Sequence, residues 1–388
     1  MYVESYTEEG AVRNHADRIQ ALGGKVLIVT GRHSSKVNGS LKDMTDTLDG
    51  IGISYVIYDE VEENPSVETV VKAANLGMDF GADFIIGIGG GSPMDASKAI
   101  AQLMYHVGRC DAVRDGSTAV DVCGSEGSMT KTGVVTVEAA IEIMYNPANT
   151  DHYPIVAVPT TCGTGSEATG VSVITRHDLR TKKSLPQKIY PALALLDPGY
   201  LTFASDKVLR DTAIDAMGHM IESYINTTAT DESRKDAVEG LGYWRKARAV
   251  MDGSRDMRDL TNMLIAANYG GKAISVTGTS IPHALSYRLT YELGMPHGMA
   301  IGVFEPGFMK YADEGDVRTL LAAMGFKDLG EFTDFIYDKC STSDYDTDKL
   351  REVCKKGATA FMDEADRIRK VPYEVTSEKI RDIADITG

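Results

Sequence analysis

The chain has 388 residues, a length that fits two domains better than one. Its hydrophobic fraction of 43% and charged fraction of 25% are typical of globular proteins and argue against extended disorder. With 40 Lys and Arg against 56 Asp and Glu, the net charge is −16, so neither nucleic acid nor an anionic membrane is expected as a broad partner.

The first residues and the cysteines favour a reducing, aqueous compartment. Residues 1–10 are acidic and lack the apolar core of a signal peptide, and no run of about 18 apolar residues occurs. The cysteines are odd in number and widely spaced, which argues against a disulfide framework. They are Cys110, Cys123, Cys162, Cys340 and Cys354. We therefore predict a cytoplasmic protein without a membrane span.

The first half of the chain alternates short strands with helices. Four buried, β-branched runs predict strands, and residues 66–77 have the pattern of a helix. The runs lie at residues 25–30, 53–58, 83–87 and 154–158. This alternation predicts an α/β layer around a mostly parallel sheet. Residues 111–152 are rich in Gly, Ser and Thr and show no period, so we predict an elaborated loop there, with or without a hairpin.

From about residue 206 onward, long amphipathic helices replace this alternation. Ile214, Met217, Ile221 and Tyr224 recur at steps of three and four residues, which marks one face of a helix. We therefore predict an α/β dinucleotide-binding domain over residues 1–190. An all-α domain is expected over residues 191–388.

A glycine-rich turn follows the third predicted strand. Residues 87–99 read GIGGGSPMDASKA, so a buried strand leads through Gly89–Ser92 into a helix. Glycines allow close backbone approach, and the N–H groups at a helix start favour an anion such as pyrophosphate. The pattern is neither GxGxxG nor a Walker motif, and a tight connection without a ligand is also compatible with it. Asp95 and Lys98 are equally compatible with a solvated helix face.

A second turn of this kind follows the fourth predicted strand and reads PTTCGTGSE. The hydroxyls of Thr160, Thr161, Thr164 and Ser166 can donate to a ribose or a phosphate. A helix cap explains the same Ser/Thr and Glu pattern. Both turns follow strands of the predicted sheet, and ligands of open α/β sheets bind at the carboxyl ends of the strands.

The first strand ends in a small basic stretch. Gly31 is followed by the phosphate donors Arg32, Ser34, Ser35 and Lys36 and by no acidic residue. A carboxylate here would bind the ribose 2′-hydroxyl of NAD, whereas donors without a nearby carboxylate suit the 2′-phosphate of NADP. The alternative is an ordinary exposed loop.

Three histidines and one aspartate in the second half have the spacing of a metal site. Asp215 and His219 are four residues apart, so they lie on one face of a helix. Pro282 marks a helix start and places His283 in the first turn, and His297 lies in a glycine- and proline-rich turn. Three imidazoles and a carboxylate suit Zn²⁺ or Fe²⁺, whereas Mg²⁺ and Ca²⁺ prefer oxygen ligands.

Taken in order, five motifs resemble those of the iron-dependent (group III) alcohol dehydrogenases. The motifs are GGGSPMDASKA, PTTCGTGSE, DAMGHMIESY, IPHALSY and MPHGMA. The resemblance covers nearly the whole chain. It implies a dehydroquinate synthase-like fold, with a Rossmann-like α/β domain followed by an all-α metal-binding domain. It also implies hydride transfer between NADP(H) and a short-chain primary alcohol or its aldehyde.

The resemblance carries the family's metal ligands over to Asp215, His219, His283 and His297. The implied ion is Fe²⁺, with Zn²⁺ as the alternative. Together with the residues discussed above, the predicted cofactor site comprises Gly31, Arg32, Ser34, Ser35, Lys36, Gly89, Gly90, Gly91, Ser92, Asp95, Thr160, Thr161, Thr164, Ser166 and Lys183, with Lys182 as an alternative to Lys183. The stretch from Gly31 to Lys36 resembles the branch of butanol and 1,3-propanediol dehydrogenases, so NADP(H) is expected in preference to NAD(H).

The chain departs from the family pattern in three places. Many members have a histidine four residues after the third ligand, often assigned to a proton relay, and Tyr287 stands there in this chain. We expect its phenol to take over that role. The stretch before PTTCGTGSE is longer than usual. The N-terminus lacks the usual apolar strand, so we expect an altered sheet edge.

Several alternatives share parts of this pattern. A hydroxyacid–oxoacid transhydrogenase and a glycerol dehydrogenase-like polyol oxidoreductase use the same scaffold, and a regulator would hold a nucleotide and a structural metal without catalysis. Dehydroquinate synthase would need several cations near the metal, and Arg288 is the one evident from the sequence. We expect a small alcohol or aldehyde as the partner, and a homo-oligomer is compatible with the sequence.

Overall fold

The computed structural model describes residues 3–114 and 134–386 of the chain. It divides into two compact units, Met1–Thr160 with Ser166–Phe203, and Thr161–Gly165 with Ala204–Gly388. The expected boundary after residue 190 precedes a strand that pairs within the sheet of the first unit, which is why residues 191–203 belong to that unit. No helix in the described ranges is long and apolar enough to cross a membrane.

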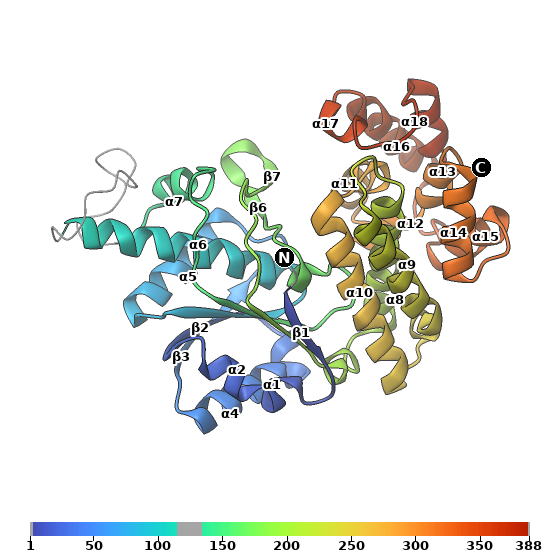
Figure 1. Ribbon diagram of the computed structural model, residues 1–388. Coiled ribbons are helices and arrows are strands. Elements are labelled where there is room, and N and C mark those ends of the chain that lie inside the picture. The colour runs from blue at the N-terminus through green and yellow to red at the C-terminus, as the bar shows by residue number, and fades with distance from the viewer. Residues whose placement is uncertain (1–2, 115–133, 387–388) are drawn as a thin grey trace. The chain divides into compact units, whose positions relative to one another are not determined.

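The first unit is built on a six-stranded sheet in which every pair of neighbours is parallel (Figure 1). The strands are β1 (Glu4–Thr7), β2 (Lys25–Gly31), β3 (Ser54–Val61), β4 (Phe84–Gly89), β5 (Ile155–Pro159) and β8 (Leu193–Leu196), in the spatial order β1-β8-β5-β4-β2-β3. The four predicted runs form β2, β3, β4 and β5, so the predicted parallel α/β layer is confirmed. An antiparallel hairpin of β6 (Val173–Arg176) and β7 (Thr181–Ser184) lies outside this sheet.

Helices cover both faces of the sheet (Figure 1). Their bounds are α1 (Ala11–Asn14), α2 (Ala16–Gln20), α3 (Ser34–Val37), α4 (Ser40–Ile51), α5 (Val67–Phe80), α6 (Gly91–Arg114) and α7 (Val137–Met144), with short 3₁₀ turns at Ser166–Ala168, His177–Leu179 and Pro198–Leu201. Val26 and Ile28 of β2 pack with α1, α2 and α4, whereas Leu27 and Val29 pack with α5, α6 and α7. Successive strand side chains point to opposite faces, so the apolar run of β2 serves two cores.

The N-terminal segment forms the edge strand β1, which pairs in parallel with β8 from Glu4 to Thr7 and is polar and partly exposed, as its sequence implies. One expectation for this unit needs correction. The predicted loop over 111–152 is wrong in part: α6 continues to Arg114, and α7 forms with Thr136 as its N-cap, accepting from the N–H of Ala139 at 3.3 Å. Residues 115–133 lie outside the described part, and the hairpin interpretation with them.

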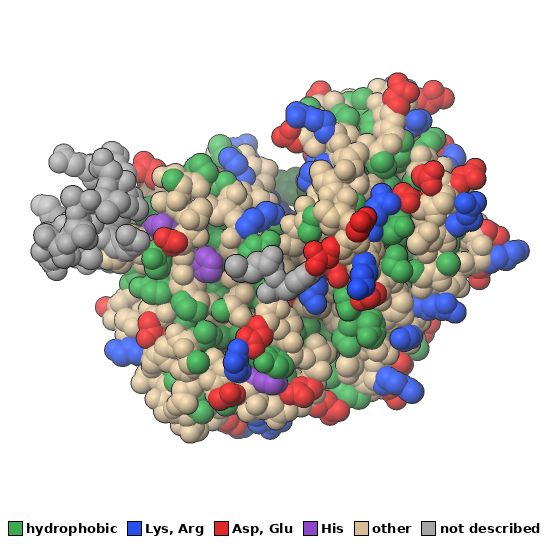
Figure 2. Space-filling view, in the orientation of Figure 1, with side chains coloured by type: hydrophobic (Ala, Val, Ile, Leu, Met, Phe, Trp, Pro, Cys, Tyr) green, Lys and Arg blue, Asp and Glu red, His purple; other side chains and the backbone are tan. Residues whose placement is uncertain are grey.

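The second unit is helical in its described part, which confirms the predicted all-α region. Its helices are α8 (Asp206–Tyr224), α9 (Asp231–Lys246), α10 (Met257–Thr277), α11 (Ile281–Leu293), α12 (His297–Gly302), α13 (Glu305–Met309), α14 (Glu314–Met324), α15 (Leu329–Lys339), α16 (Thr347–Phe361), α17 (Ala365–Ile368) and α18 (Ser377–Ile383), with a 3₁₀ turn at Arg248–Asp252. Helix α8 is buried on all sides from Ala213 to Tyr224. Acidic and basic side chains are interspersed over the outer helices (Figure 2).

Residues 161–165 belong to this helical unit although they follow β5 in the chain. Gly165 has φ 57°, and a Cβ atom there would lie 2.6 Å from the Cα of Gly271 in α10. A Cβ on Gly163 would lie 3.0 Å from Oδ2 of Asp215 in α8. Glycines at both positions therefore let this turn pack directly against two helices.

Candidate metal and cofactor sites

The predicted metal ligands are neighbours in the second unit. Asp215 and His219 lie one turn apart on α8, and His283 faces them from the first turn of α11, where Pro282 stands at the helix start. Oδ1 of Asp215 is 3.5 Å from Nε2 of His219 and 3.6 Å from Nε2 of His283. His297 begins α12, and its ring centroid is 5.5 Å from that of His283.

This donor set fits a divalent cation. One ligand atom from each of Asp215, His219 and His283 lies within 4.8 Å of the other two, and all three residues are buried. Oδ1 of Asp215, Nδ1 of His219 and Nε2 of His283 are buried and have no hydrogen-bond partner among the described residues. Buried polar atoms without partners are costly, and a bound cation would satisfy those that face it. Imidazole and carboxylate donors suit Fe²⁺ or Zn²⁺.

The protonation states of Asp215 and His219 favour metal binding as well. Burial alone would raise the pKa of Asp215, but the imidazoles of His219, His283 and His297 outweigh it, so the pKa lies well below its usual range. Burial also lowers the pKa of His219, although Asp215 opposes that shift. An ionised carboxylate and a neutral imidazole are the forms that coordinate a cation.

A buried carboxylate, Glu222, is hydrogen-bonded to Nδ1 of His283 and was not predicted from the sequence. It lies on α8, three residues after His219, and accepts hydrogen bonds from Nδ1 of His283 and from the backbone N–H of Ser280. Burial lowers the pKa of His283, but Glu222 and Asp215 outweigh it and raise the pKa well above its usual range. Metal-binding histidines commonly have such a partner on the second nitrogen, which fixes tautomer and orientation. The spacing of Asp215, His219 and Glu222 on one face of α8 was the available signal.

A second buried acid, Glu305 of α13, lies close to Glu222. Burial raises its pKa well above the usual range, and the charge of Glu222 raises it further. Two neighbouring buried carboxyl groups do not both ionise, and the raised pKa places the proton on Glu305. Gly218 makes room for this acid, because a Cβ there would lie 2.8 Å from Oε1 of Glu305.

Tyr287 lies one turn after His283 on α11, next to the predicted ligands. Its ring is nearly parallel to that of His297, with centroids 6.2 Å apart and an interplanar angle of 9°. The side chain is 46% exposed. Arg367 of α17 also lies beside this ring, with its guanidinium carbon 5.1 Å from the Tyr287 ring centroid. This arginine was not predicted, because nothing in the local sequence links it to α11.

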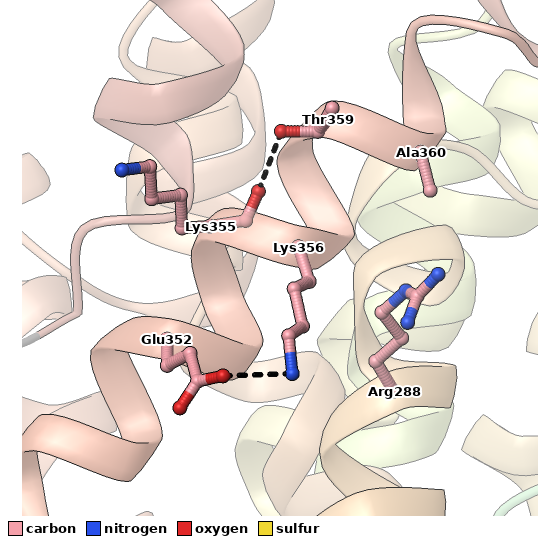
Figure 3. A pocket seen from close by; sticks show the side chains of 6 residues that line it. All are labelled: Arg288, Glu352, Lys355, Lys356, Thr359 and Ala360. Atoms are coloured by element: carbon pink, nitrogen blue, oxygen red, sulfur yellow. Dashed lines mark hydrogen bonds and ion pairs between the residues drawn. The ribbon is translucent and has the colours of Figure 1, made fainter.

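Arg288, the one cation that the sequence showed near the predicted ligands, lies at the surface beside α16. It lines a surface hollow of about 370 Å³ together with residues of α16 such as Glu352 and Lys356. Figure 3 shows its side chain beside Lys356, which pairs with Glu352 at 2.8 Å. Arg288 itself pairs with Glu292 at 3.1 Å. The two exposed ion pairs are typical of a solvated helix surface.

In the first unit, the glycine turn lies beside Thr160, the start of the second predicted turn. Gly89 has φ 147° and leads from β4 into α6, and its carbonyl accepts from the N–H of Thr160 at 2.8 Å. Gly90, Gly91 and Ser92 complete the first turn, and Ser92 Oγ accepts from the N–H of Asn64 at 3.1 Å. The glycine turn and the start of the threonine turn are thus neighbours at the carboxyl ends of β4 and β5. Thr161 and Thr164 belong to the segment that packs beside Asp215 in the second unit.

Asp95 and Lys98 form a buried network, so the interpretation as a solvated helix face is wrong. Asp95 accepts from Oγ of Ser166 at 2.7 Å and from the N–H of Val173 at 3.0 Å. Lys98 is fully buried and donates to the carbonyls of Ser166 and Val171 at 2.8 and 2.7 Å. Burial lowers the pKa of Lys98 to about 8. These two predicted cofactor residues, Asp95 and Ser166, bond each other and hold the segment that follows the second turn.

The basic stretch after β2 is only partly available to a ligand. Arg32 and Ser34 are exposed, but Ser35 is buried and accepts from Thr30 Oγ1 at 2.8 Å. Nζ of Lys36 lies 2.5 Å from Oδ2 of Asp59 in β3. The expectation of no nearby carboxylate is therefore wrong. The two strands are parallel neighbours, which brings Asp59 next to a stretch that precedes it by more than twenty residues.

The two candidate lysines of β7 have different partners. Nζ of Lys182 donates to Oδ1 of Asn64 at 2.7 Å, and Asn64 in turn bonds Ser92 of the glycine turn. Nζ of Lys183 lies 5.4 Å from the ring centroid of Tyr145. The structure thus brings Lys182, rather than the selected Lys183, towards the glycine turn.

Comparisons with known proteins agree with this architecture. Residues 3–198 match the family model of the iron-containing alcohol dehydrogenases, and residues 210–387 match that of the C-terminal part of the same family. Lactaldehyde reductase of Escherichia coli strain K12 is 30% identical over 308 residues, which is 78% of this chain and 72% of that protein. The NADPH-dependent butanol dehydrogenase of Clostridium saccharobutylicum is 29% identical over 294 residues, 74% of this chain and 68% of that one.

Among solved structures, an iron-containing alcohol dehydrogenase from Thermotoga maritima superposes with a TM-score of 0.79 at 32% identity. The match covers 98% of this chain and 96% of that one. Sequence and fold therefore agree over both units. The chain belongs to the iron-containing alcohol dehydrogenase family and is an oxidoreductase.

Proposed function

We propose that the protein is a metal-dependent alcohol dehydrogenase or aldehyde reductase that transfers hydride between NADP(H) and a short-chain primary alcohol or its aldehyde. The observation that carries the proposal is the buried cluster of Asp215, His219 and His283, whose ligand atoms lie within 4.8 Å of one another, with His297 beside it. Fe²⁺ is the proposed ion, and Zn²⁺ suits the same donors. A divalent ion held by these residues would supply Lewis acidity for the alcohol or aldehyde chemistry.

The chain's own residues contribute orientation and proton transfer. Glu222 fixes the ring of His283 so that Nε2 is turned towards Asp215. Tyr287, beside His297, offers a phenol that exchanges a proton with the substrate oxygen as alcohol and aldehyde interconvert. A nicotinamide cofactor, when bound, would supply or accept the hydride.

For the cofactor, the proposed site consists of Gly89, Ser92 and Thr160 at the strand ends, with Lys182 in place of Lys183. Backbone N–H groups at the start of α6 favour the pyrophosphate. The exposed Arg32 and Ser34, together with Lys36, support the 2′-phosphate of NADP(H), the cofactor named for the butanol dehydrogenase relative.

NAD(H) is a second candidate because of one observation. The carboxylate of Asp59 lies 2.5 Å from Nζ of Lys36, which offsets the charge of that lysine. A carboxylate at the end of a neighbouring strand can accept from a ribose 2′-hydroxyl.

We also propose that the enzyme acts in the cytoplasm, in line with its buried free thiols at Cys162, Cys340 and Cys354.

The test uses purified protein loaded with Fe²⁺ or Zn²⁺ and supplied with ethanal, propanal or butanal. We expect aldehyde-dependent oxidation of NADPH that exceeds that of NADH in kcat/KM, that stops on chelation and that returns when the ion is restored. Full activity after chelation would contradict the metal assignment. A clear preference for NADH would overturn the choice of NADP(H).

A further inference from the structure

We propose that Arg367 makes this site selective for substrates that carry an oxoanion, such as a carboxylate or a sulfonate, at the end remote from the reacting carbon. The proposal rests on the alcohol and aldehyde chemistry proposed above. It narrows the substrate from a neutral short-chain aldehyde to an acidic one.

The first support is the position of the guanidinium. Arg367 lies on α17, and its guanidinium carbon is 5.1 Å from the centroid of the Tyr287 ring. That ring is nearly parallel to the ring of His297, 6.2 Å away. A single aromatic side chain therefore separates the cation from a predicted metal ligand. These two distances place the guanidinium carbon within about 11 Å of the centroid of the His297 ring, so the proposal requires a substrate that is bound through its oxygen at the ligands and extends past the Tyr287 ring.

The second support is that the guanidinium is incompletely paired. Its ion pair is with Glu364, which bonds Nε at 3.0 Å, while the side chain is only 26% exposed. Nη1 is enclosed and has no hydrogen-bond partner within the described ranges. A buried donor without an acceptor is unfavourable, and the planar fork of arginine is suited to carboxylate and related oxoanions.

The third support is a second cation close to the first. Nζ of Lys370 donates to the carbonyl of Thr277 at 2.9 Å, at the end of α10 and six residues before His283. Burial lowers the pKa of Lys370, and the charge of Arg367 lowers it further, although the carboxylate of Asp366 opposes the shift. No ion pair of Lys370 with a carboxylate is found among the residues that the structure describes. An anion placed near both groups relieves their mutual repulsion.

Arg369 provides a matched contrast on the same segment. Its side chain is 75% exposed and pairs with Asp366 at 3.1 Å, and this pair resembles an ordinary surface ion pair. Replacing it removes one positive charge from the same stretch of chain without touching Tyr287. It therefore separates a local effect of Arg367 from a general effect of charge.

The kinetic test compares butanal with succinic semialdehyde, which has the same chain length and a terminal carboxylate, and with 3-sulfopropanal as the sulfonate arm. We expect the metal-loaded wild-type protein to prefer one or both acids by about 10- to 100-fold in kcat/KM. Arg367→Gln should abolish that preference and leave butanal within about twofold. Arg369→Gln should behave like the wild type. Equal losses for butanal and for the acids in Arg367→Gln would show a purely structural role and overturn the proposal.

A binding experiment separates this proposal from the proposed function. Isothermal titration calorimetry measures the Kd of 4-hydroxybutyrate, 3-hydroxypropane-1-sulfonate and butan-1-ol for the metal-loaded protein. Binding of an acid that is tighter than butan-1-ol and weakened about tenfold in Arg367→Gln supports the anion assignment, even if no aldehyde is reduced and the proposed function fails. Binding of the acids no tighter than that of butan-1-ol, or unchanged in Arg367→Gln, overturns it.

Discussion

Glu222 accepts a hydrogen bond from Nδ1 of His283, and the opposite nitrogen of that ring, Nε2, lies 3.6 Å from Oδ1 of Asp215. A carboxylate, an imidazole and a second carboxylate thus form a chain through the buried centre of the second unit. Because Glu222 occupies one ring nitrogen, the other is left for a cation. The arrangement orients His283 before any ion is bound, and an ion that binds there displaces the proton that the raised pKa keeps on the ring.

Replacing Glu222 tests this arrangement. Glu222→Gln keeps an acceptor of the same size but removes the charge, so His283 should be held less firmly. We expect the affinity for Zn²⁺ to fall by about 10- to 100-fold while the fold persists. Competition against a chelator measures the affinity, and circular dichroism monitors the fold. Glu314→Gln, on an exposed 95% accessible side chain of α14, is the control. An unchanged affinity would remove the supporting role of Glu222.

Removing a ligand has a different signature. His283→Ala should lose bound metal and activity and remain folded, because the imidazole leaves only a small buried gap. In the wild type, added metal should raise Tm, since it binds the folded state alone. In the variant that rise should disappear. His177→Ala, on an exposed histidine of the first unit, should retain the wild-type response. A variant that still binds one ion per chain and is stabilised by it would contradict the assignment.

The proton relay is tested by Tyr287→Phe. The substitution keeps the ring that lies against His297 and Arg367 and removes only the hydroxyl. We expect kcat to fall by about 100-fold, with unchanged metal content and an altered pH dependence of kcat. Tyr291→Phe, one turn further along α11 on a side chain that is 91% exposed, should have no effect. If Tyr287→Phe turns over at the wild-type rate, the proton takes another path.

Cofactor choice depends on the pair Lys36 and Asp59. Lys36→Ala should lower kcat/KM for NADPH by about tenfold and affect NADH little, because it removes a phosphate donor. Asp59→Asn should favour NADPH, because it removes the neighbouring negative charge. Lys42→Ala on α4, where the lysine is 74% exposed and pairs with Asp46, is the control. Equal effects of Lys36→Ala on both cofactors would show that no 2′-phosphate binds there.

Asp211 links stability to pH in the metal-free protein. Burial, with Asp215 nearby, raises its pKa from 3.8 to about 6, although the N–H of Met299 donates to it at 2.9 Å. A carboxyl group with a raised folded pKa binds its proton more tightly in the native state. Its contribution to stability is present below the unfolded pKa and is lost as pH rises from about 4 to about 6.

Asp211→Asn should lack this loss. Relative to the wild type, its free energy of unfolding should rise by about 2 kcal/mol across that pH window. Trp244, the single tryptophan, donates to the carbonyl of Ala213 in α8, so its fluorescence reports on the second unit during denaturant unfolding. Asp338→Asn, on a 72% exposed side chain, should show no such divergence. If the free energies of unfolding of Asp211→Asn and of the wild type change with pH in the same way, the raised pKa of Asp211 is contradicted.

Patterns within a few residues were sufficient to predict much of this protein. The continuous apolar run from Val26 to Val29 is typical of a strand that is buried on both faces. The four-residue step from Asp215 to His219 places both side chains on one face of α8. Pro282 determines where α11 begins, and with it the place of His283. Each of these depends on local backbone geometry, which neighbouring residues decide.

Only the tertiary structure decided which distant groups meet. Glu222 reaches His283 across 61 residues, Asp59 lies beside Lys36 because β2 and β3 are neighbours, and Arg367 rests on Tyr287. The burial of Lys98, which the sequence left compatible with a solvated face, likewise follows from the segment that covers it. Helix and strand propensities act over single turns, whereas these contacts, and the charges they shift, depend on how whole elements pack.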